Sequence, residues 1–181
     1  MSFSVGPGLS APLGATVTED GVNFAVFSDH ATQIYVCLFD ESGTETRIPL
    51  PEREGGIFYG HINGLKAGQL YGLRAQGPYR PDEGHRFNVN KLLIDPYARQ
   101  LAGEFRWDYA VFDYASMEAP DEANTRDSAA FIPKCVVPDQ TPRHDKGPQV
   151  PWSESIFYET NVRGFTMRHP GIDERTRGKF S

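Results

Sequence analysis

The sequence predicts an all-β protein whose main body is an immunoglobulin-like β-sandwich over roughly residues 10 to 105. Short runs rich in Val, Ile, Tyr and Phe recur between turn signals at a spacing of roughly 8 to 12 residues, which is typical of antiparallel sheets. No run keeps a helical period, and 14 prolines with 18 glycines would interrupt any long helix. Helix is therefore expected to be a minor element.

Five strands are expected in order along the first half of the chain, each bounded by Gly, Asn, Asp or Ser. They cover residues 22–28, 33–39, 46–50, 57–62 and 70–77. The run at 46–50 has the weakest apolar pattern of the five. Gly72 and Gly77 in the last strand indicate a bulge or a close approach of another backbone.

The second half of the chain is more polar. Residues 113–151 are rich in Pro, Asp, Glu and Lys, which predicts a long connection between domains. One more strand-like run, IFYETNVRGF at 156–165, follows Trp152. We therefore expect a sandwich module at 1–112, a connection at 113–151 and the start of another domain at 152–181.

Composition excludes several classes of partner and site. With 24 acidic and 18 basic residues the net charge is −6, the wrong sign for binding a phosphate backbone, so no nucleic-acid partner is expected. No run approaches the roughly 20 apolar residues that span a bilayer, and the first residues lack a basic, apolar leader. We expect a cytoplasmic protein with no membrane partner.

The cysteines and histidines predict no metal site and no cofactor. Cys37 and Cys135 form no C-x-x-C pair, and Cys37 lies in an apolar run, where we expect a small buried side chain rather than a reactive thiol. The five histidines show no metal-ligand spacing.

Residues 71–99, YGLRAQGPYRPDEGHRFNVNKLLIDPYAR, resemble the glycogen-debranching and isoamylase branch of the alpha-amylase clan. Further motifs of that family follow its order at residues 12–14, 21–28, 127–137 and 158–166. The chain departs from the family pattern at Leu73, Gln76, Asn161 and Lys179. These departures bear on substrate preference rather than on membership.

The resemblance implies a sandwich of the isoamylase N-terminal carbohydrate-binding type, followed by a linker and the first strand of an incomplete (β/α)8 barrel at 152–181. It also implies a parent enzyme that hydrolyses α-1,6 branch linkages in glycogen and limit dextrin by a retaining mechanism with two carboxylates. In the family these carboxylates come from later strands of a barrel that needs roughly 250 residues. We therefore expect no catalytic residue in this chain and no activity from it alone.

The resemblance also names the expected partners, an α-glucan and the missing catalytic barrel in cis. A stand-alone glucan-binding module without an enzyme is the alternative. A branching or trehalose-releasing enzyme of the same clan is a third interpretation, which fits residues 71–88 less well. The run at 156–165 favours the first hypothesis, because a sandwich has no use for it.

A group of cationic and aromatic side chains is the candidate sugar site. Aromatic faces stack on sugar rings and Arg binds hydroxyls, so a platform could form from Arg74, Arg80, Arg86 and Lys91 interleaved with Tyr71, Tyr79, Phe87 and Tyr97. We favour the alternative that these Arg residues pair with carboxylates such as Asp82 and Asp95 and join the module to the barrel.

Within this group, the resemblance narrows the expected contacts. Glycogen-binding relatives carry a Lys and a Trp in the hairpin equivalent to 71–79, and these align with Gly72 and Tyr79. Only the aromatic is retained, so binding should be weak. The chain also has Phe58 and Tyr59 where the family often has a Trp-His pair. Our expected carbohydrate contacts are Tyr79, Phe58 and Arg80.

Overall fold

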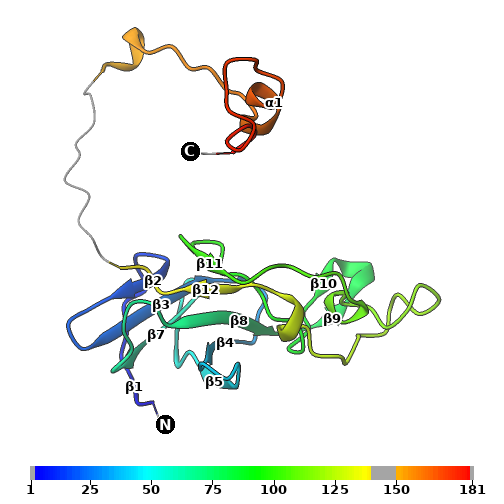
Figure 1. The fold of residues 1–181 in the computed structure, drawn as a ribbon. Coiled ribbons are helices and arrows are strands. Elements are labelled where there is room, and N and C mark those ends of the chain that lie inside the picture. Colours follow the sequence, from blue (N-terminus) through cyan, green and yellow to red (C-terminus); the bar gives the residue numbers. More distant parts are fainter. Residues whose placement is uncertain (1–2, 140–149, 180–181) are drawn as a thin grey trace. The chain divides into compact units, whose positions relative to one another are not determined.

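The computed structural model describes residues 3–139 and 150–179. The chain divides into two compact units, residues 1–141 and 142–181, which we describe separately (Figure 1). The first unit is built from short strands, and the described part of the second contains only short helices. Within these described ranges, no helix is both long and apolar enough to cross a membrane.

The first sheet of the first unit is antiparallel. In spatial order its strands are β1 (Val5–Gly6), β7 (Ile57–Asn63), β3 (Gly21–Phe27) and β2 (Gly14–Val17), and β6 (Glu52–Glu54) also pairs with β7. Side chains of β7 alternate between buried and half-buried positions, as expected when one face of a strand meets a core.

The second sheet is also antiparallel and lies across the core from the first. Its order is β11 (Leu101–Ala102), β12 (Lys134–Val136), β8 (Leu70–Gln76), β4 (Gln33–Phe39) and β5 (Glu45–Pro49). A separate hairpin joins β9 (Tyr79–Arg80) to β10 (His85–Arg86) through a 3-10 turn at Pro81–Glu83. Further 3-10 turns lie at Tyr109–Val111 and Ala129–Phe131.

Apolar side chains from both sheets form the main core. Phe24 of β3 packs edge-to-face on Tyr71 of β8, with ring centroids 5.2 Å apart. The fully or nearly fully buried members include Val22, Val26, Ile34, Val36, Leu38, Ile48, Phe58, Ile62, Leu73 and Val137. The predicted all-β sandwich is confirmed, and its five central strands begin and end within one residue of the predicted bounds.

Strand β12 lies inside the region that we expected to be an interdomain connection. Cys135 pairs with Tyr71 across the β12–β8 ladder and is completely buried. The sandwich therefore extends beyond residue 112 and takes in residues 134–136. The polar composition around this strand hid it, because only three residues of the run enter the sheet.

The second unit does not form the expected strand at residues 156–165. Its described part contains a 3-10 turn at Trp152–Glu154 and one short helix, α1 (Val162–Thr166). A strand needs neighbours to satisfy its backbone groups. Here the Asn161 side chain instead accepts a hydrogen bond from the Gly164 amide and caps α1. The structure therefore does not show the expected barrel strand in this run.

Candidate functional site

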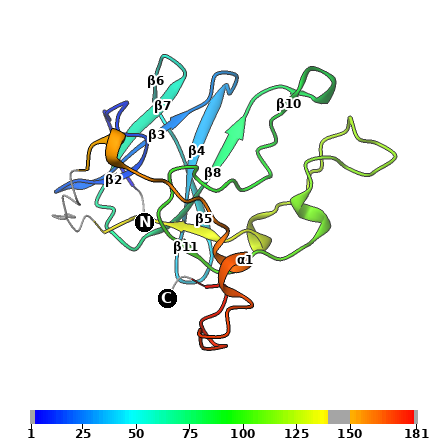
Figure 2. The ribbon, with the colours of Figure 1, turned by 90° about the horizontal axis from the view of Figure 1, so that it is seen from above.

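The chain itself covers much of the outer face of the second sheet. Alternate residues of β4 and β8 point away from the main core, and they meet side chains of the segment that runs from β10 to β12. Figure 2 shows the backbone path of that segment. This second, smaller core contains Cys37, Phe39 and Leu92, with Tyr35, Leu70, Ala129 and Ile132 packed against it. A ligand therefore cannot lie flat across the middle of this face.

Gly72 lies under this cover. A Cβ atom at residue 72 would come within 2.7 Å of the Leu92 Cδ1 atom. The absence of a side chain at this position thus allows Leu92 to pack on the strand. A residue with a side chain could not occupy this position unless Leu92 moved.

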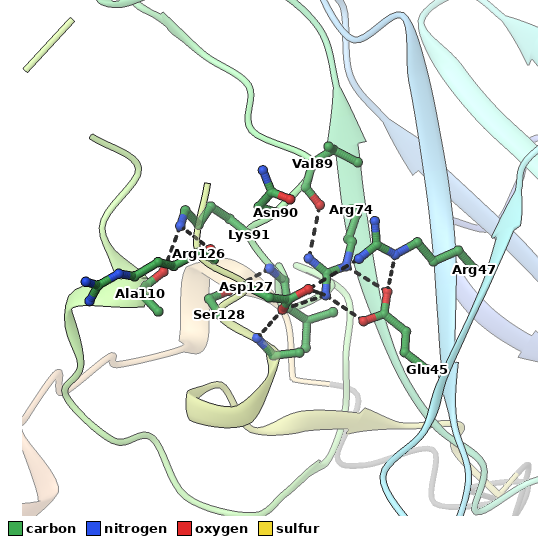
Figure 3. A network of polar contacts seen from close by, with 12 residues as sticks. Glu45, Arg47, Arg74, Val89, Asn90, Lys91, Ala110, Arg126, Asp127 and Ser128 are labelled. Carbon is green, nitrogen blue, oxygen red and sulfur yellow. Dashed lines mark hydrogen bonds and ion pairs between the residues drawn. The ribbon is translucent and has the colours of Figure 1, made fainter. Parts of the chain in front are cut away.

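Arg74 is the buried centre of an ion network on the same face, in which Arg47 also pairs with Glu45 and Asp127 (Figure 3). Arg74 is 0% exposed, and its guanidinium donates to both Glu45 carboxylate oxygens at 2.8 and 2.5 Å. It also donates to Asp127 Oδ2 at 2.8 Å and to the Val89 carbonyl at 3.0 Å. One side chain therefore joins β5, β8 and the two parts of the covering segment.

The electrostatics of this network keep all three groups charged. Burial opposes ionisation of Arg74, but the hydrogen bonds that it donates to Glu45 and Asp127 outweigh this effect and raise the Arg74 pKa. Burial likewise opposes ionisation of the two carboxyls, yet the Arg74 hydrogen bonds hold the pKa of each below its usual value. Such fully paired charges indicate a structural role rather than acid–base chemistry.

Other buried polar groups also attach the covering segment to the sheet. Lys91, 6% exposed, donates from Nζ to the Ala110 and Arg126 carbonyls at 2.8 and 2.7 Å, and burial lowers its pKa. Tyr71 donates its hydroxyl to Asp95 at 2.7 Å. These contacts make the irregular segment a fixed part of the module.

The eight side chains of the proposed platform therefore do not form one surface: Arg80, Arg86 and Tyr97 are exposed, and the other five are buried or half-buried. Tyr71, Arg74 and Lys91 are buried and cannot touch a sugar. Arg74 does pair with carboxylates, as the favoured alternative expected. Its partners are Glu45 and Asp127 rather than Asp82 and Asp95, and the link lies within the module.

A groove of about 490 Å³ lies between one end of the second sheet and the residues that follow β10. Its lining combines two aromatic rings with hydrogen-bonding groups: Tyr35, Arg47, Gln76, Gly77, Phe87, Asn88, Val89 and Ala123. The Tyr35 hydroxyl donates to Gln76 Oε1 at 3.0 Å, and the Phe87 ring lies close over Gly77. Aromatic faces beside amide and guanidinium groups are chemically suited to a sugar ring.

The structure does not bring the three predicted sugar contacts together. Tyr79 is half-buried, and its hydroxyl donates to the Asp113 carbonyl at 3.3 Å. Arg80 is exposed and pairs with Glu83 at 2.8 Å.

Phe58 requires a correction, because it is 3% exposed and lies in the main core beneath the Arg53 guanidinium. It shares a strand face with buried Ile62, four residues along β7, so the alternation of the strand could have identified it as a core residue.

Sequence reasoning missed the role of Tyr35 and Gln76 in the groove. Both stand at one end of the outer face of the second sheet, and no motif marks them. Among residues 3–139 and 150–179, no group of three or more His, Cys, Asp or Glu side chains could hold a metal ion.

Comparison with known proteins identifies the sandwich. Residues 12–98 match carbohydrate-binding module 48, the isoamylase N-terminal domain. Proteins named glycogen debranching enzyme from Yersinia enterocolitica and Klebsiella pneumoniae are 45% and 44% identical over 96% and 98% of this chain. The chain spans 26% of the length of each of these relatives.

Solved structures show the same fold at low sequence identity. A pullulanase from Anoxybacillus sp. LM18-11 matches 93% of this chain and 20% of its own, with a TM-score of 0.53 at 19% identity. The same pullulanase complexed with maltotriose gives a TM-score of 0.52. The paired sheets, the motif order and the close relatives agree, so the sandwich of this chain belongs to the isoamylase N-terminal domain family of carbohydrate-binding modules.

Proposed function

We propose that this chain is the substrate-orienting part of a glycogen-debranching hydrolase that cleaves α-1,6 branch linkages in glycogen and limit dextrin. The observation that carries the proposal is the 45% identity to a glycogen debranching enzyme over nearly the whole chain. In this proposal the module supports a catalytic domain in cis, residues 152–181 begin that domain, and the enzyme works in the cytoplasm.

The architecture supports a binding role without chemistry. The half-buried Glu45 and the exposed Asp127 carboxylates are both paired with Arg74, and retaining hydrolysis needs two free carboxyl groups about 5 Å apart. The groove beside Tyr35 and Phe87 offers a short contact surface for a glucan. Because Leu92 covers Gly72, we expect the affinity of the isolated chain to be weak.

Two measurements on the purified chain test this proposal. Co-sedimentation with glycogen should retain part of the protein, while a reducing-end assay with glycogen, pullulan or amylopectin should detect no hydrolysis. Release of reducing ends by the chain alone would contradict the inactive role. Failure to sediment at any glycogen concentration would contradict the binding role.

Tyr79 is the variant that tests the family-derived contact. Tyr79→Ala should weaken glycogen binding by about 1 to 3 kcal/mol if its ring stacks on a sugar. Arg80→Ala in the same hairpin tests the other accessible predicted contact, and Tyr158→Ala, which removes a ring that is 79% exposed in the second unit, is the matched control. Unchanged binding by Tyr79→Ala would remove this residue from the site.

A stand-alone glucan-binding module is the second candidate, favoured by the compact first unit with its own core. Sequencing the gene beyond the codon for Ser181 separates the two. A reading frame that continues into a barrel supports the debranching enzyme, and an immediate stop codon supports the stand-alone module.

A further inference from the structure

Five aromatic residues form a continuous surface that we call the aromatic ridge: Phe105, Trp107, Tyr109, Phe112 and Tyr114. Successive rings are in contact. Centroids lie 4.8 Å apart for Phe105 and Trp107, 6.2 Å for Trp107 and Phe112, and 5.3 Å for Phe112 and Tyr114. Trp107 is 78% exposed, Phe105 45% and Tyr109 39%, so the ridge presents ring surface to solvent.

Buried polar side chains hold the backbone beneath the ridge. Asn124 is 4% exposed, and its Nδ2 donates to the Tyr109 and Phe112 carbonyls at 2.9 and 3.0 Å. Lys91 donates to the Ala110 carbonyl, and the Asp108 carboxylate accepts from the Ala110 amide at 2.8 Å. Burying Asn124 and Lys91 has a desolvation cost, and these hydrogen bonds offset it.

This arrangement is the reverse of ordinary packing. Polar groups lie inside and fix an irregular segment, while large apolar rings lie outside. Exposed apolar patches of this kind mark binding surfaces, and rings that are held in place before binding lose little conformational freedom when a ligand arrives. The ridge therefore has the properties of a preorganised recognition surface.

We propose that the aromatic ridge binds a linear α-glucan chain, at a site separate from the groove and outside the family module at residues 12–98. The inference rests on the proposed function, because the identity of the ligand comes from it. The Trp107 and Phe112 rings stack on each other with 26° between their planes, which holds the Trp107 indole in place, and the large exposed surface of that indole can stack on the apolar face of a sugar ring.

Charged groups beside the ridge favour a sugar over an apolar protein partner. Arg106, Asp108 and Asp113 alternate with the aromatic residues along the sequence, and Arg126 lies 5.8 Å from the centre of the Tyr109 ring. Asp108, Asp113 and Arg106 already bond the Ala110 amide, Arg86 and the Ala130 carbonyl. The exposed Arg126 guanidinium makes no hydrogen bond to another described residue and can bond glucan hydroxyls, whereas the centres of protein interfaces are depleted in Asp.

Tryptophan fluorescence of the full 181-residue chain provides the test, because Trp107 and Trp152 are its only tryptophans. In a Trp152→Phe variant, Trp107 is the sole reporter. Titration with maltoheptaose should then change its emission, and Trp107→Ala should weaken maltoheptaose binding measured by calorimetry about tenfold, a typical loss for one stacking ring.

Trp152→Ala is the matched control. It removes a side chain of the same type that is 82% exposed in the other unit, and it should leave binding unchanged. Thermal melting of each variant confirms folding, because replacing an exposed ring should not lower the melting temperature.

The outcomes separate the two proposals. If the chain binds maltoheptaose equally well with and without Trp107, the ridge proposal is overturned and the proposed function stands. If the unmodified chain binds neither maltoheptaose nor glycogen, both fall. If Trp107→Ala only converts a dimer to a monomer in ultracentrifugation, the ridge is an interface between copies and the glucan proposal is overturned.

Discussion

Two runs with a strand-like pattern adopt different structures in this molecule: one forms a strand and the other does not. QIYVCLF at 33–39 becomes β4, lies between β5 and β8, and buries Val36 and Cys37 completely. IFYETNVRGF at 156–165 forms no strand, and Ile156, Phe157 and Tyr158 are 96%, 72% and 79% exposed. The first run has a ladder on each side, and the second has none among the described residues of its unit.

The comparison teaches that an alternating apolar pattern in a sequence does not by itself make a strand. It indicates a segment that becomes a strand when neighbouring strands are present. A β-branched and aromatic run gains stability only when neighbouring strands satisfy its backbone and another layer covers its side chains. Residues 156–165 have the pattern but no neighbouring strand among the described residues, which agrees with the proposal that they begin a barrel. The predictions below test this contrast.

The largest effect is expected at Arg74, which pairs with Tyr35 of β4 across the ladder. Arg74→Met should lower the free energy of unfolding by roughly 3 kcal/mol, because it removes the buried guanidinium that bonds Glu45 and Asp127 and leaves Glu45 with only the more exposed Arg47 as a counter-charge. Urea denaturation measures the loss. Arg80→Met, which breaks an exposed pair, should cost no more than about 1 kcal/mol, and an equal loss in both variants would contradict the buried network.

The second-largest difference is expected when one side chain in each run is truncated and the losses in the free energy of unfolding are compared. Leu38→Ala removes a 3% exposed core residue of β4 and should cost about 2 to 5 kcal/mol. Ile156→Ala should stay within about 0.5 kcal/mol, because that side chain is 96% exposed. Comparable losses in the two variants, measured by thermal unfolding, would show that Ile156 has a packing partner.

Acid should lower the stability of the sandwich that contains residues 33–39, and it should not affect residues 156–165. The lowered pKa values of Glu45 and Asp127 stabilise the fold above their ordinary values of 4.5 and 3.8, and that stability is lost as the pH falls through the folded values. Urea midpoints between pH 6 and pH 3 should therefore fall. Arg74→Met should flatten this dependence, and an unchanged slope in that variant would argue against the assignment.

Hydrogen exchange examines the contrast without changing the sequence. Amides of β4 and β8 should exchange slowly, whereas those at residues 156–161 should exchange nearly as fast as in an unstructured peptide. Mass spectrometry on a dilute monomer measures both. Strong protection at 156–161 in that sample would be incompatible with the structure.

The sequence was sufficient for the central strands, because their alternation and turns are local signals. It did not reveal the network around Arg74, since Asp127 lies 53 residues away and only the folded chain brings it there. Strand β12 was missed for the same reason: three residues, Lys134–Val136, carry too short a pattern, and their pairing with β8 depends on contacts remote in sequence.

The candidate site was less predictable than the fold. Tyr79 and Arg80 come from the family motif, and the structure leaves both at least partly accessible, while Phe58 was misjudged because its strand parity was ignored. The aromatic ridge does have a sequence signal, five aromatic residues within 105–114. That signal was hidden because the segment lies where the strand pattern ends.

The position of β12 also constrains when the sandwich can be completed. It pairs with β8 through residues that lie more than 60 positions later in the chain, and it supplies Cys135 to the main core. During synthesis, Leu73 can pair with Leu93, but the first residues of β8 would present an open edge until residues 134–136 leave the ribosome. A fragment that ends at residue 112 would keep that edge permanently, and unpaired edges promote aggregation. A soluble fragment of this module should accordingly extend at least to Val137, whose amide and carbonyl bond Gln69 and Gly68 and close the sheet.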